Sequence, residues 1–210
     1  MPLILTDPPW PNCDICFCDD PAGTFAAFAF QAARISGRLI VVLGCDTDVR
    51  FLSTVPKSLP FFRLCWLRRI PGSYRGSLFY SADVAYVFGH QALNGTDRVI
   101  GGESTAVLQK DRDDDNPHPT RRHIEHMSWL VRKFSRPGDL VLDPFCGSGS
   151  TLVAAKRAGR PYCGIDKEKE YCDFAELRLS EATTFFDPPS VVPVRRGGSF
   201  NLNRSARYKR

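Results

Sequence analysis

The chain has 210 residues, 43% of them hydrophobic, and a formal net charge of +5 at pH 7. This length and apolar content fit one globular α/β domain with a buried core. Apolar runs such as Leu39–Leu43 are no longer than a strand, and Asp7 and two prolines interrupt the opening stretch. A membrane-spanning helix and a secretory signal peptide are therefore excluded, and we expect a soluble, cytoplasmic protein without a membrane partner.

Apolar runs in the first half of the chain predict buried strands separated by short helices. The expected strands cover residues 3–7, 38–43, 61–67 and 84–88, and the expected helices cover residues 24–36 and 47–54. Pro71-Gly72-Ser73 is expected to lie in the turn that joins the third and fourth strands. Residues 90–117 show no periodicity, which favours a loop or a small insert.

The second half alternates helical and strand patterns. The expected helices cover residues 121–134, 150–158 and 168–180, and the expected strands cover residues 139–143 and 161–166. A Gly-rich turn separates the strand at 139–143 from the following helix. This βαβα order implies a parallel sheet with helical crossovers.

Cysteines and the charged tail are less informative. Reduced thiols are expected in the absence of a secretory signal, and Cys13, Cys16 and Cys18 lack the second ligand pair of a structural zinc site, so no metal is predicted. Residues 195–210 hold six Lys or Arg residues and no acidic residue. Such a tail fits either a solvated, flexible segment or a contact with nucleic-acid phosphates.

The Gly-rich turn Asp143-Pro144-Phe145-Cys146-Gly147-Ser148-Gly149 follows a buried strand, where open α/β sheets bind ligands. No Gly-Lys-Ser/Thr sequence is present, so a P-loop is excluded. The dinucleotide fingerprint fails because its third glycine would fall at Leu152. Asp166 closes the next strand, where a carboxylate commonly accepts hydrogen bonds from ribose. S-adenosyl-L-methionine, a nucleoside cofactor without a diphosphate, fits best; the alternative is a tight turn and a helix cap without a ligand.

Asp7-Pro8-Pro9-Trp10 follows the first strand and can present a carboxylate, a carbonyl and an aromatic ring together. These groups suit a planar base that carries an amino group. The tripeptide alone means little, because Asp187-Pro188-Pro189 follows a predicted helix and has Ser190 in place of the aromatic residue. That second copy is interpreted as a helix-ending linker.

Three stretches together resemble the permuted (β-class) DNA amino-methyltransferases, in which the catalytic Asp-Pro-Pro-aromatic motif precedes the cofactor motif. They are residues 116–120, residues 137–155, and Gly164-Ile165-Asp166 with Tyr171. The resemblance covers about residues 3–180. It implies a Rossmann-like, circularly permuted methyltransferase fold with a mostly parallel twisted sheet and helices on both faces. It also implies a site-specific enzyme, of the kind found in restriction–modification, that methylates N6 of adenine in double-stranded DNA by base flipping.

The resemblance also implies roles for individual residues. The catalytic residues would be Asp7, Pro8, Pro9 and Trp10. The cofactor-binding residues would be His118, Pro119, Thr120, Asp143, Pro144, Phe145, Cys146, Gly147, Ser148, Gly149 and Asp166. We expect residues 1–180 to form the catalytic domain, with a small recognition insert at about 90–117, and residues 181–210 to form a basic, flexible tail. The insert is small for an independent recognition domain, which leaves short or relaxed specificity, or a homodimer, as alternatives. The resemblance to DNA-modifying enzymes also implies a nucleoid-associated location.

Several alternatives stay open. Asp rather than Ser at position 7 leans towards adenine in the resembled family, but cytosine N4 is also an exocyclic amine. A non-catalytic DNA-binding relative is a third reading. Relatives usually carry a strand and an acidic turn before the catalytic motif, whereas Met1 almost abuts it here. In those relatives the strand and turn form part of the pocket for the adenine of the cofactor. Here the tail could replace that part of the pocket, cofactor affinity could be weak, or the chain could be incomplete.

Overall fold

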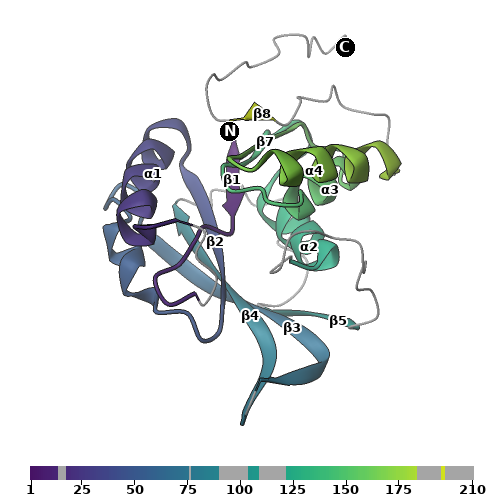
Figure 1. Cartoon of the computed structure of the whole chain (residues 1–210). Coiled ribbons are helices and arrows are strands. Elements are labelled where there is room, and N and C mark those ends of the chain that lie inside the picture. The colour runs from purple at the N-terminus through teal and green to yellow at the C-terminus, as the bar shows by residue number, and fades with distance from the viewer. Residues whose placement is uncertain (14–17, 76, 90–103, 109–121, 184–194, 197–210) are drawn as a thin grey trace. The chain divides into compact units, whose positions relative to one another are not determined.

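The computed structural model describes residues 1–13, 18–75, 77–89, 104–108, 122–183 and 195–196. The chain divides into two compact units, Met1–Arg112 and Asp113–Arg210, each with its own strands and helices (Figure 1). None of the described helices is long and apolar enough to cross a membrane.

The first unit is built on a mixed sheet with the strand order β5-β3-β4-β2-β1. Its strands are β1 (Leu3–Thr6), β2 (Arg38–Gly44), β3 (Phe61–Arg75), β4 (Leu78–Gly89) and β5 (Ser104–Leu108). β1 runs parallel to β2, β4 is antiparallel to both β2 and β3, and β5 is parallel to β3. Every residue of β1 is buried, as the continuous apolar runs predicted.

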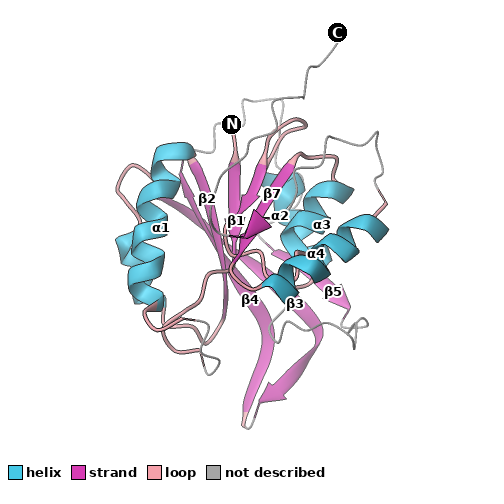
Figure 2. Ribbon diagram, turned by 45° about the horizontal axis from the view of Figure 1, so that its top comes forward, coloured by secondary structure: helices cyan, strands magenta, loops and turns pink. Residues whose placement is uncertain are grey.

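Helix α1 (Pro21–Ile35) connects β1 to β2 and lies beside these strands (Figure 2). It begins three residues before the predicted start because the carboxylate of Asp20 accepts a 2.9 Å hydrogen bond from the Gly23 backbone N–H. Pro21 then occupies the first helical turn, where its missing N–H costs nothing. Phe25 is buried against Phe51 of the 3₁₀-helix η1 (Val49–Thr54), with their ring centroids 4.7 Å apart.

The β3–β4 hairpin is longer than predicted, and it projects as a twisted ribbon in Figure 2. The expected turn at Pro71-Gly72-Ser73 is wrong, because these residues lie inside β3. The register shifts between Arg68 and Ser73, so Pro71 sits in an irregular stretch where its missing N–H breaks no regular ladder. The chain reverses after Arg75, the last residue of β3.

The expectation of a loop over residues 90–117 is wrong for Ser104–Leu108, which form β5. The strand has no alternating apolar pattern because it lies at the sheet edge, with Ser104 and Ala106 exposed. Its order comes from backbone pairing with β3, which residue patterning does not reveal. The other residues of the predicted insert lie outside the described residues.

The second unit carries three strands in the order β6-β7-β8, all parallel to their neighbours. They are β6 (Val141–Asp143), β7 (Tyr162–Asp166) and the short β8 (Arg195–Arg196). The helices are α2 (Ile124–Phe134), α3 (Ser150–Arg157) and α4 (Lys169–Glu181). This is the predicted βαβα order, with α3 crossing from β6 to β7.

Among its described residues, the predicted flexible tail contributes the strand β8 to this sheet. Arg195 pairs with Ile165 and Arg196 pairs with Asp166, so β8 lies alongside the carboxyl end of β7. Two residues carry too little periodicity to be recognised as a strand, and only the pairing defines them. Residues 197–210 and the second Asp-Pro-Pro at residues 187–189 lie outside the described residues.

Candidate functional site

The Gly-rich turn leaves β6 at Asp143 and enters α3 at Ser150. Asp143 is 2% exposed, and its carboxylate accepts a 3.2 Å hydrogen bond from the Phe145 backbone N–H. The chain then turns back on itself, with the Gly149 N–H donating to the Cys146 carbonyl at 2.8 Å. Gly147 and Gly149 have φ angles of 47° and 80°, a backbone conformation that favours glycine. Both glycines are therefore required by the path of the turn.

Gly149 meets a second restriction from helix α4. A Cβ atom at this position would lie 2.7 Å from the Cβ of Ala175, which real Cβ contacts do not reach. The missing side chain lets the start of α3 approach α4 closely. The turn thus brings its backbone to the carboxyl end of β6, where open α/β sheets bind ligands, without a side chain at Gly147 or Gly149.

Asp166, the last residue of β7, fixes the same turn from the neighbouring strand. Its carboxylate accepts hydrogen bonds from the Gly147 N–H at 2.8 Å and from the Glu168 N–H at 3.0 Å. The Cys146 N–H also donates to the Ile165 carbonyl at 3.0 Å. An ionised carboxylate offers about four lone-pair positions, so Asp166 can still accept hydrogen bonds from two ribose hydroxyls. The residues present fit a nucleoside ligand.

Arg178 on α4 is a supporting residue that the sequence analysis missed. Its guanidinium donates to the Ser148 carbonyl at 2.5 Å and lies within 3.2 Å of the Ser148 hydroxyl and 3.3 Å of the Ser150 hydroxyl. These contacts link Ser148 and Ser150 to a residue of α4 that lies 30 and 28 residues further along the chain. An arginine near the end of a helix has no local sequence signal for this role.

Cys146 lies inside the turn, and its side chain is buried. Burial, together with the nearby carboxylates of Asp143 and Asp166, raises the pKa of the Cys146 thiol well above its ordinary value. The thiol therefore stays protonated at neutral pH and is a poor nucleophile. Its side chain serves packing, since a Cβ at Gly164 would come within 3.0 Å of the Cys146 Sγ.

The Asp-Pro-Pro-Trp turn in the first unit follows β1. Pro8 is buried, while Asp7, Pro9 and Trp10 are each partly exposed. A hydrogen bond of 3.2 Å from the Cys13 N–H to the Trp10 carbonyl closes the stretch that follows. The two prolines fix their own φ angles and offer no N–H groups, which stiffens the segment.

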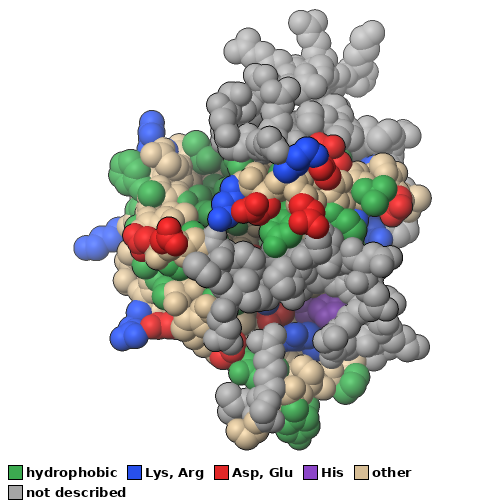
Figure 3. All heavy atoms as spheres, viewed as in Figure 1, with side chains coloured by type: hydrophobic (Ala, Val, Ile, Leu, Met, Phe, Trp, Pro, Cys, Tyr) green, Lys and Arg blue, Asp and Glu red, His purple; other side chains and the backbone are tan. Residues whose placement is uncertain are grey.

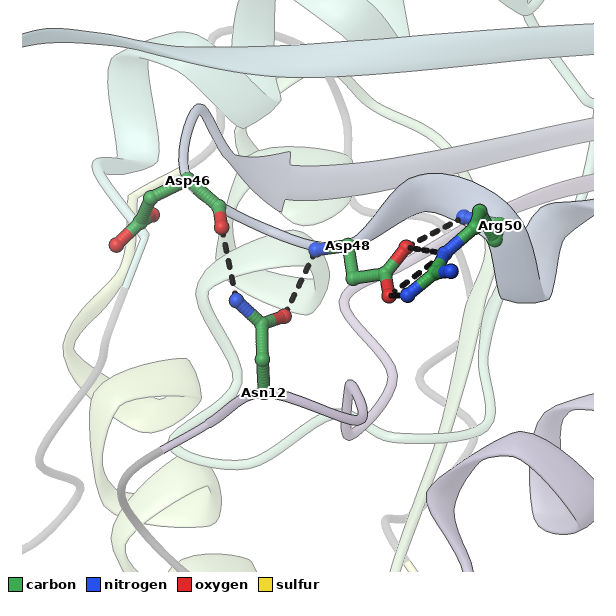
Figure 4. A network of polar contacts seen from close by, with 4 residues as sticks. All are labelled: Asn12, Asp46, Asp48 and Arg50. Carbon is green, nitrogen blue, oxygen red and sulfur yellow. Dashed lines mark hydrogen bonds and ion pairs between the residues drawn. The ribbon is translucent and has the colours of Figure 1, made fainter.

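Asn12 is the second residue that the sequence analysis missed, and Figure 4 shows its contacts. Its side-chain amide donates to the Asp46 carbonyl at 2.9 Å and accepts from the Asp48 N–H at 2.7 Å. Asp48 in turn accepts from the Arg50 N–H at the start of η1 and forms an ion pair with the Arg50 side chain. Asn12 thereby joins the segment after β1 to the loop after β2.

The predicted site residues fall into three groups. Asp143 to Gly149 and Asp166 are brought together in the second unit. Asp7 to Trp10 lie together in the first unit. His118, Pro119 and Thr120 lie outside the described residues. Within the described part of the chain, no group of three or more His, Cys, Asp or Glu side chains could hold a metal ion.

Comparison with known proteins identifies the family. A family model described as DNA methylase, N6_N4_Mtase, matches residues 72–177, slightly more than half of the chain. The chain belongs to this DNA methylase family. A type II methyltransferase of Lactococcus lactis subsp. cremoris, M2.LlaDCHI, is 43% identical over 68 residues. That match covers 32% of this chain and 25% of the relative, so the chain spans only a quarter of that protein's length.

Solved structures of methyltransferases share the fold of this chain. The M1.HpyAVI–SAM complex has a TM-score of 0.66 and 22% identity, over 85% of this chain and 88% of that one. The cytosine-N4-specific PvuII DNA methyltransferase has a TM-score of 0.65 and 15% identity, over 85% of this chain and 79% of that one. The predicted Rossmann-like methyltransferase fold is confirmed, with a mixed sheet. The permuted motif order stays a prediction.

Proposed function

We propose that this DNA methylase transfers the methyl group of S-adenosyl-L-methionine to the N6 amino group of an adenine in double-stranded DNA. The observation that carries the proposal is the pair of strand-end turns. One is a glycine turn hydrogen-bonded to the carboxylate of Asp166, and the other presents Asp7 with Pro8 and Trp10. M1.HpyAVI, which has the same fold, was solved as a SAM complex. The type II methyltransferase relative supports a role in restriction–modification.

In this proposal the second unit holds the cofactor. Asp166 would accept hydrogen bonds from the ribose, while Phe145, Gly147 and Gly149 would line the methionine side. Asp143, Pro144, Cys146 and Ser148 complete the turn, and His118 to Thr120 would contact the carboxylate end. When bound, S-adenosylmethionine supplies a methyl group on a positively charged sulfur, which is already an activated leaving group. The protonated Cys146 thiol offers no competing nucleophile.

The first unit would prepare the amine. The lone pair of an aromatic amine is delocalised into the ring, so the amine is a poor nucleophile. The carboxylate of Asp7 and the carbonyl of Pro8 would each accept one N–H and draw the nitrogen towards tetrahedral geometry. Trp10 would stack on the base once it is extruded from the duplex. Fixed acceptors of this kind act mainly by positioning and electrostatics.

Cytosine N4 is the second candidate target, favoured by the structural similarity to the cytosine-N4-specific PvuII enzyme. Asp rather than Ser at position 7 supports adenine. A DNA-binding relative without activity is the alternative outside this chemistry. The test is to incubate the purified protein with unmethylated plasmid and S-adenosylmethionine, digest the DNA to nucleosides, and identify the modified base by mass spectrometry. N6-methyladenine is expected; N4-methylcytosine would reassign the target, and no modified base would refute the proposal.

A further inference from the structure

The β3–β4 hairpin exposes aromatic, aliphatic and arginine side chains that we call the hairpin surface. Its members are Trp66, Arg68, Ile70, Tyr74 and Phe79. Tyr74 is 73% exposed, Phe79 54%, Trp66 48% and Ile70 46%. Figure 3 shows green hydrophobic side chains at the lower end of the molecule, where Figure 1 draws this hairpin. A surface cluster of large apolar groups indicates an interaction site more than scattered single residues do.

The apolar groups on β3 follow the strand period. Trp66, Arg68 and Ile70 alternate along one face and are exposed, whereas Cys65 and Leu67 on the opposite face are completely buried. A strand with one face in the core normally presents polar residues to water. Here the outer face carries an indole and a branched aliphatic chain on either side of an arginine.

The far end of the hairpin holds an ordered pair of aromatic rings. Tyr74 and Phe79 face each other in the β3–β4 register, with ring centroids 4.9 Å apart. The Phe79 ring rests on the backbone at Gly72, where an added Cβ would come within 2.5 Å of it. The rings are held outward before any partner binds. Preorganised side chains lose less conformational entropy on binding.

The charge of the hairpin selects the kind of partner. β3 contains Arg63, Arg68, Arg69 and Arg75 and no acidic residue. The acidic residue of β4 is Asp83, which is buried and ion-paired with Arg69 at 3.2 Å. A two-fold contact with a second copy would bring arginines against arginines. A polyanion is complementary to the surface.

We propose that the hairpin surface binds duplex DNA, with Arg68 at a phosphate and the Tyr74–Phe79 pair wedged at a base step. This rests on the proposed function, because it takes DNA as the substrate. Apolar side chains inserted at a base step partly unstack it, while arginines hold the adjacent backbone. Partial unstacking lowers the cost of extruding a neighbouring base, which the proposed reaction requires. The hairpin surface is thus a DNA contact separate from Asp7 to Trp10.

The test measures binding to a fluorescent duplex across a salt series. Arg68→Gln should weaken binding and reduce the log–log salt slope by about 0.9, the value for one phosphate contact. Tyr74→Ala combined with Phe79→Ala should weaken binding by about ten- to a hundred-fold with an unchanged slope, as expected for lost stacking. Tyr74→Ala alone should give a smaller loss of the same kind. Phe30→Ala and Arg34→Gln, both exposed on α1, are matched controls that should bind like the wild type.

The outcomes separate this proposal from the proposed function. If the wild type binds DNA and the hairpin variants bind equally well, the hairpin proposal is overturned and the methyltransferase proposal stands. If a wild type that binds S-adenosylmethionine does not bind DNA, both are overturned. Sedimentation of the same variants tests for a second copy: a shifted monomer–dimer balance with unchanged DNA affinity would overturn the hairpin proposal. Removing residues 197–210 as a further arm measures how much of the salt slope belongs to the tail.

Discussion

The turn after β6 is held through its own backbone N–H groups, whereas the segment after β1 is tied to its surroundings by the side chain of Asn12. In the glycine turn, the N–H groups of Phe145, Cys146, Gly147 and Gly149 all have acceptors within the second unit. After β1, two prolines remove N–H groups, and Asn12 reaches across to the loop after β2. The glycine turn is fixed through its own N–H groups, which donate to backbone carbonyls and to the carboxylates of Asp143 and Asp166. The segment after β1 is fixed by its proline rings and by the Asn12 side chain.

This difference fits the two tasks that the proposed function assigns to the turns. A turn that receives a nucleoside benefits from a fixed backbone without side chains, and buried neighbours keep it rigid. A turn that activates an amine, as proposed for the turn after β1, must offer a carboxylate and a ring to an incoming base, and Asp7 and Trp10 are each partly exposed. We therefore expect substitutions in the first unit to reduce the rate of transfer, and substitutions in the second unit to reduce cofactor affinity.

The sharpest test of this division is Asp7→Ala. Removing one acceptor that acts in the transition state should lower kcat by about 10²–10³-fold, by analogy with oxyanion-hole donors. The dissociation constant for S-adenosylmethionine, measured by calorimetry, should stay within about two-fold of the wild type, because Asp7 lies in the first unit. Asp187→Ala, which alters the second Asp-Pro-Pro, is the matched control and should leave kcat unchanged. Near-normal turnover of Asp7→Ala would refute the role assigned to Asp7.

The converse test is Asp166. Asp166→Ala should weaken S-adenosylmethionine binding by about 10–150-fold, the equivalent of roughly 1.5–3 kcal/mol for charge-assisted hydrogen bonds. Asp166→Asn keeps one acceptor oxygen and should give an intermediate loss. Asp173→Ala, an exposed acidic position on α4, is the control. Because Asp166 also holds Gly147, thermal stability must be measured on the same samples. A lower Tm with unchanged cofactor affinity would restrict Asp166 to a structural role.

Residue patterns predicted the strands and turns that depend on residues close to one another in the sequence. Buried strands such as β1 and β2 were predicted from continuous apolar runs, and the glycine turn from its spacing. The parts that were missed depend on long-range contacts. β5 depends on pairing with β3, and the length of the hairpin depends on a bulge that accommodates Pro71.

The same distinction holds for the candidate site. Asp7 to Trp10 and Asp143 to Gly149 are contiguous motifs that the sequence identifies directly, and their functional roles stay predictions. Asn12 and Arg178 act through partners 34 to 36 and 28 to 30 residues away. Neither has a neighbouring residue that signals its partner. Supporting residues of this kind emerge only when the fold brings the segments together.

Asn12→Ala tests whether the segment after β1 depends on its side-chain tie. Losing both amide hydrogen bonds should lower kcat about ten-fold, the equivalent of about 1.4 kcal/mol, with little change in cofactor affinity. A positioning role predicts a fall in kcat with a nearly constant KM for DNA. Arg50→Ala is the matched control. It removes an exposed ion pair with Asp48 and leaves the hydrogen bonds of Asn12 intact. A fall in thermal stability without any change in kcat would show that Asn12 supports the fold but does not position the turn.

The last prediction concerns Tyr162, the first residue of β7, at the opposite end of that strand from Asp166. Its side chain is completely buried, and its hydroxyl has no hydrogen-bond partner among the described residues. Burial raises the pKa of Tyr162 from 10.0 to about 12. The pKa of Tyr162 is higher in the folded than in the unfolded protein, so the neutral side chain is favoured by folding. The stability that depends on this neutral side chain is complete below pH 10 and is lost as the pH rises towards 12. The loss should approach roughly 2–3 kcal/mol of unfolding free energy.

Tyr162→Phe removes this titration. Denaturant unfolding at pH 8 and pH 11 should show a smaller alkaline loss in the variant than in the wild type. At pH 8 the variant should be as stable as the wild type or up to about 1 kcal/mol more stable, because a buried hydroxyl without a partner is removed. Tyr74→Phe, on the exposed hairpin, should retain the alkaline loss of the wild type. Equal losses in wild type and Tyr162→Phe would contradict the assignment of the alkaline loss to Tyr162.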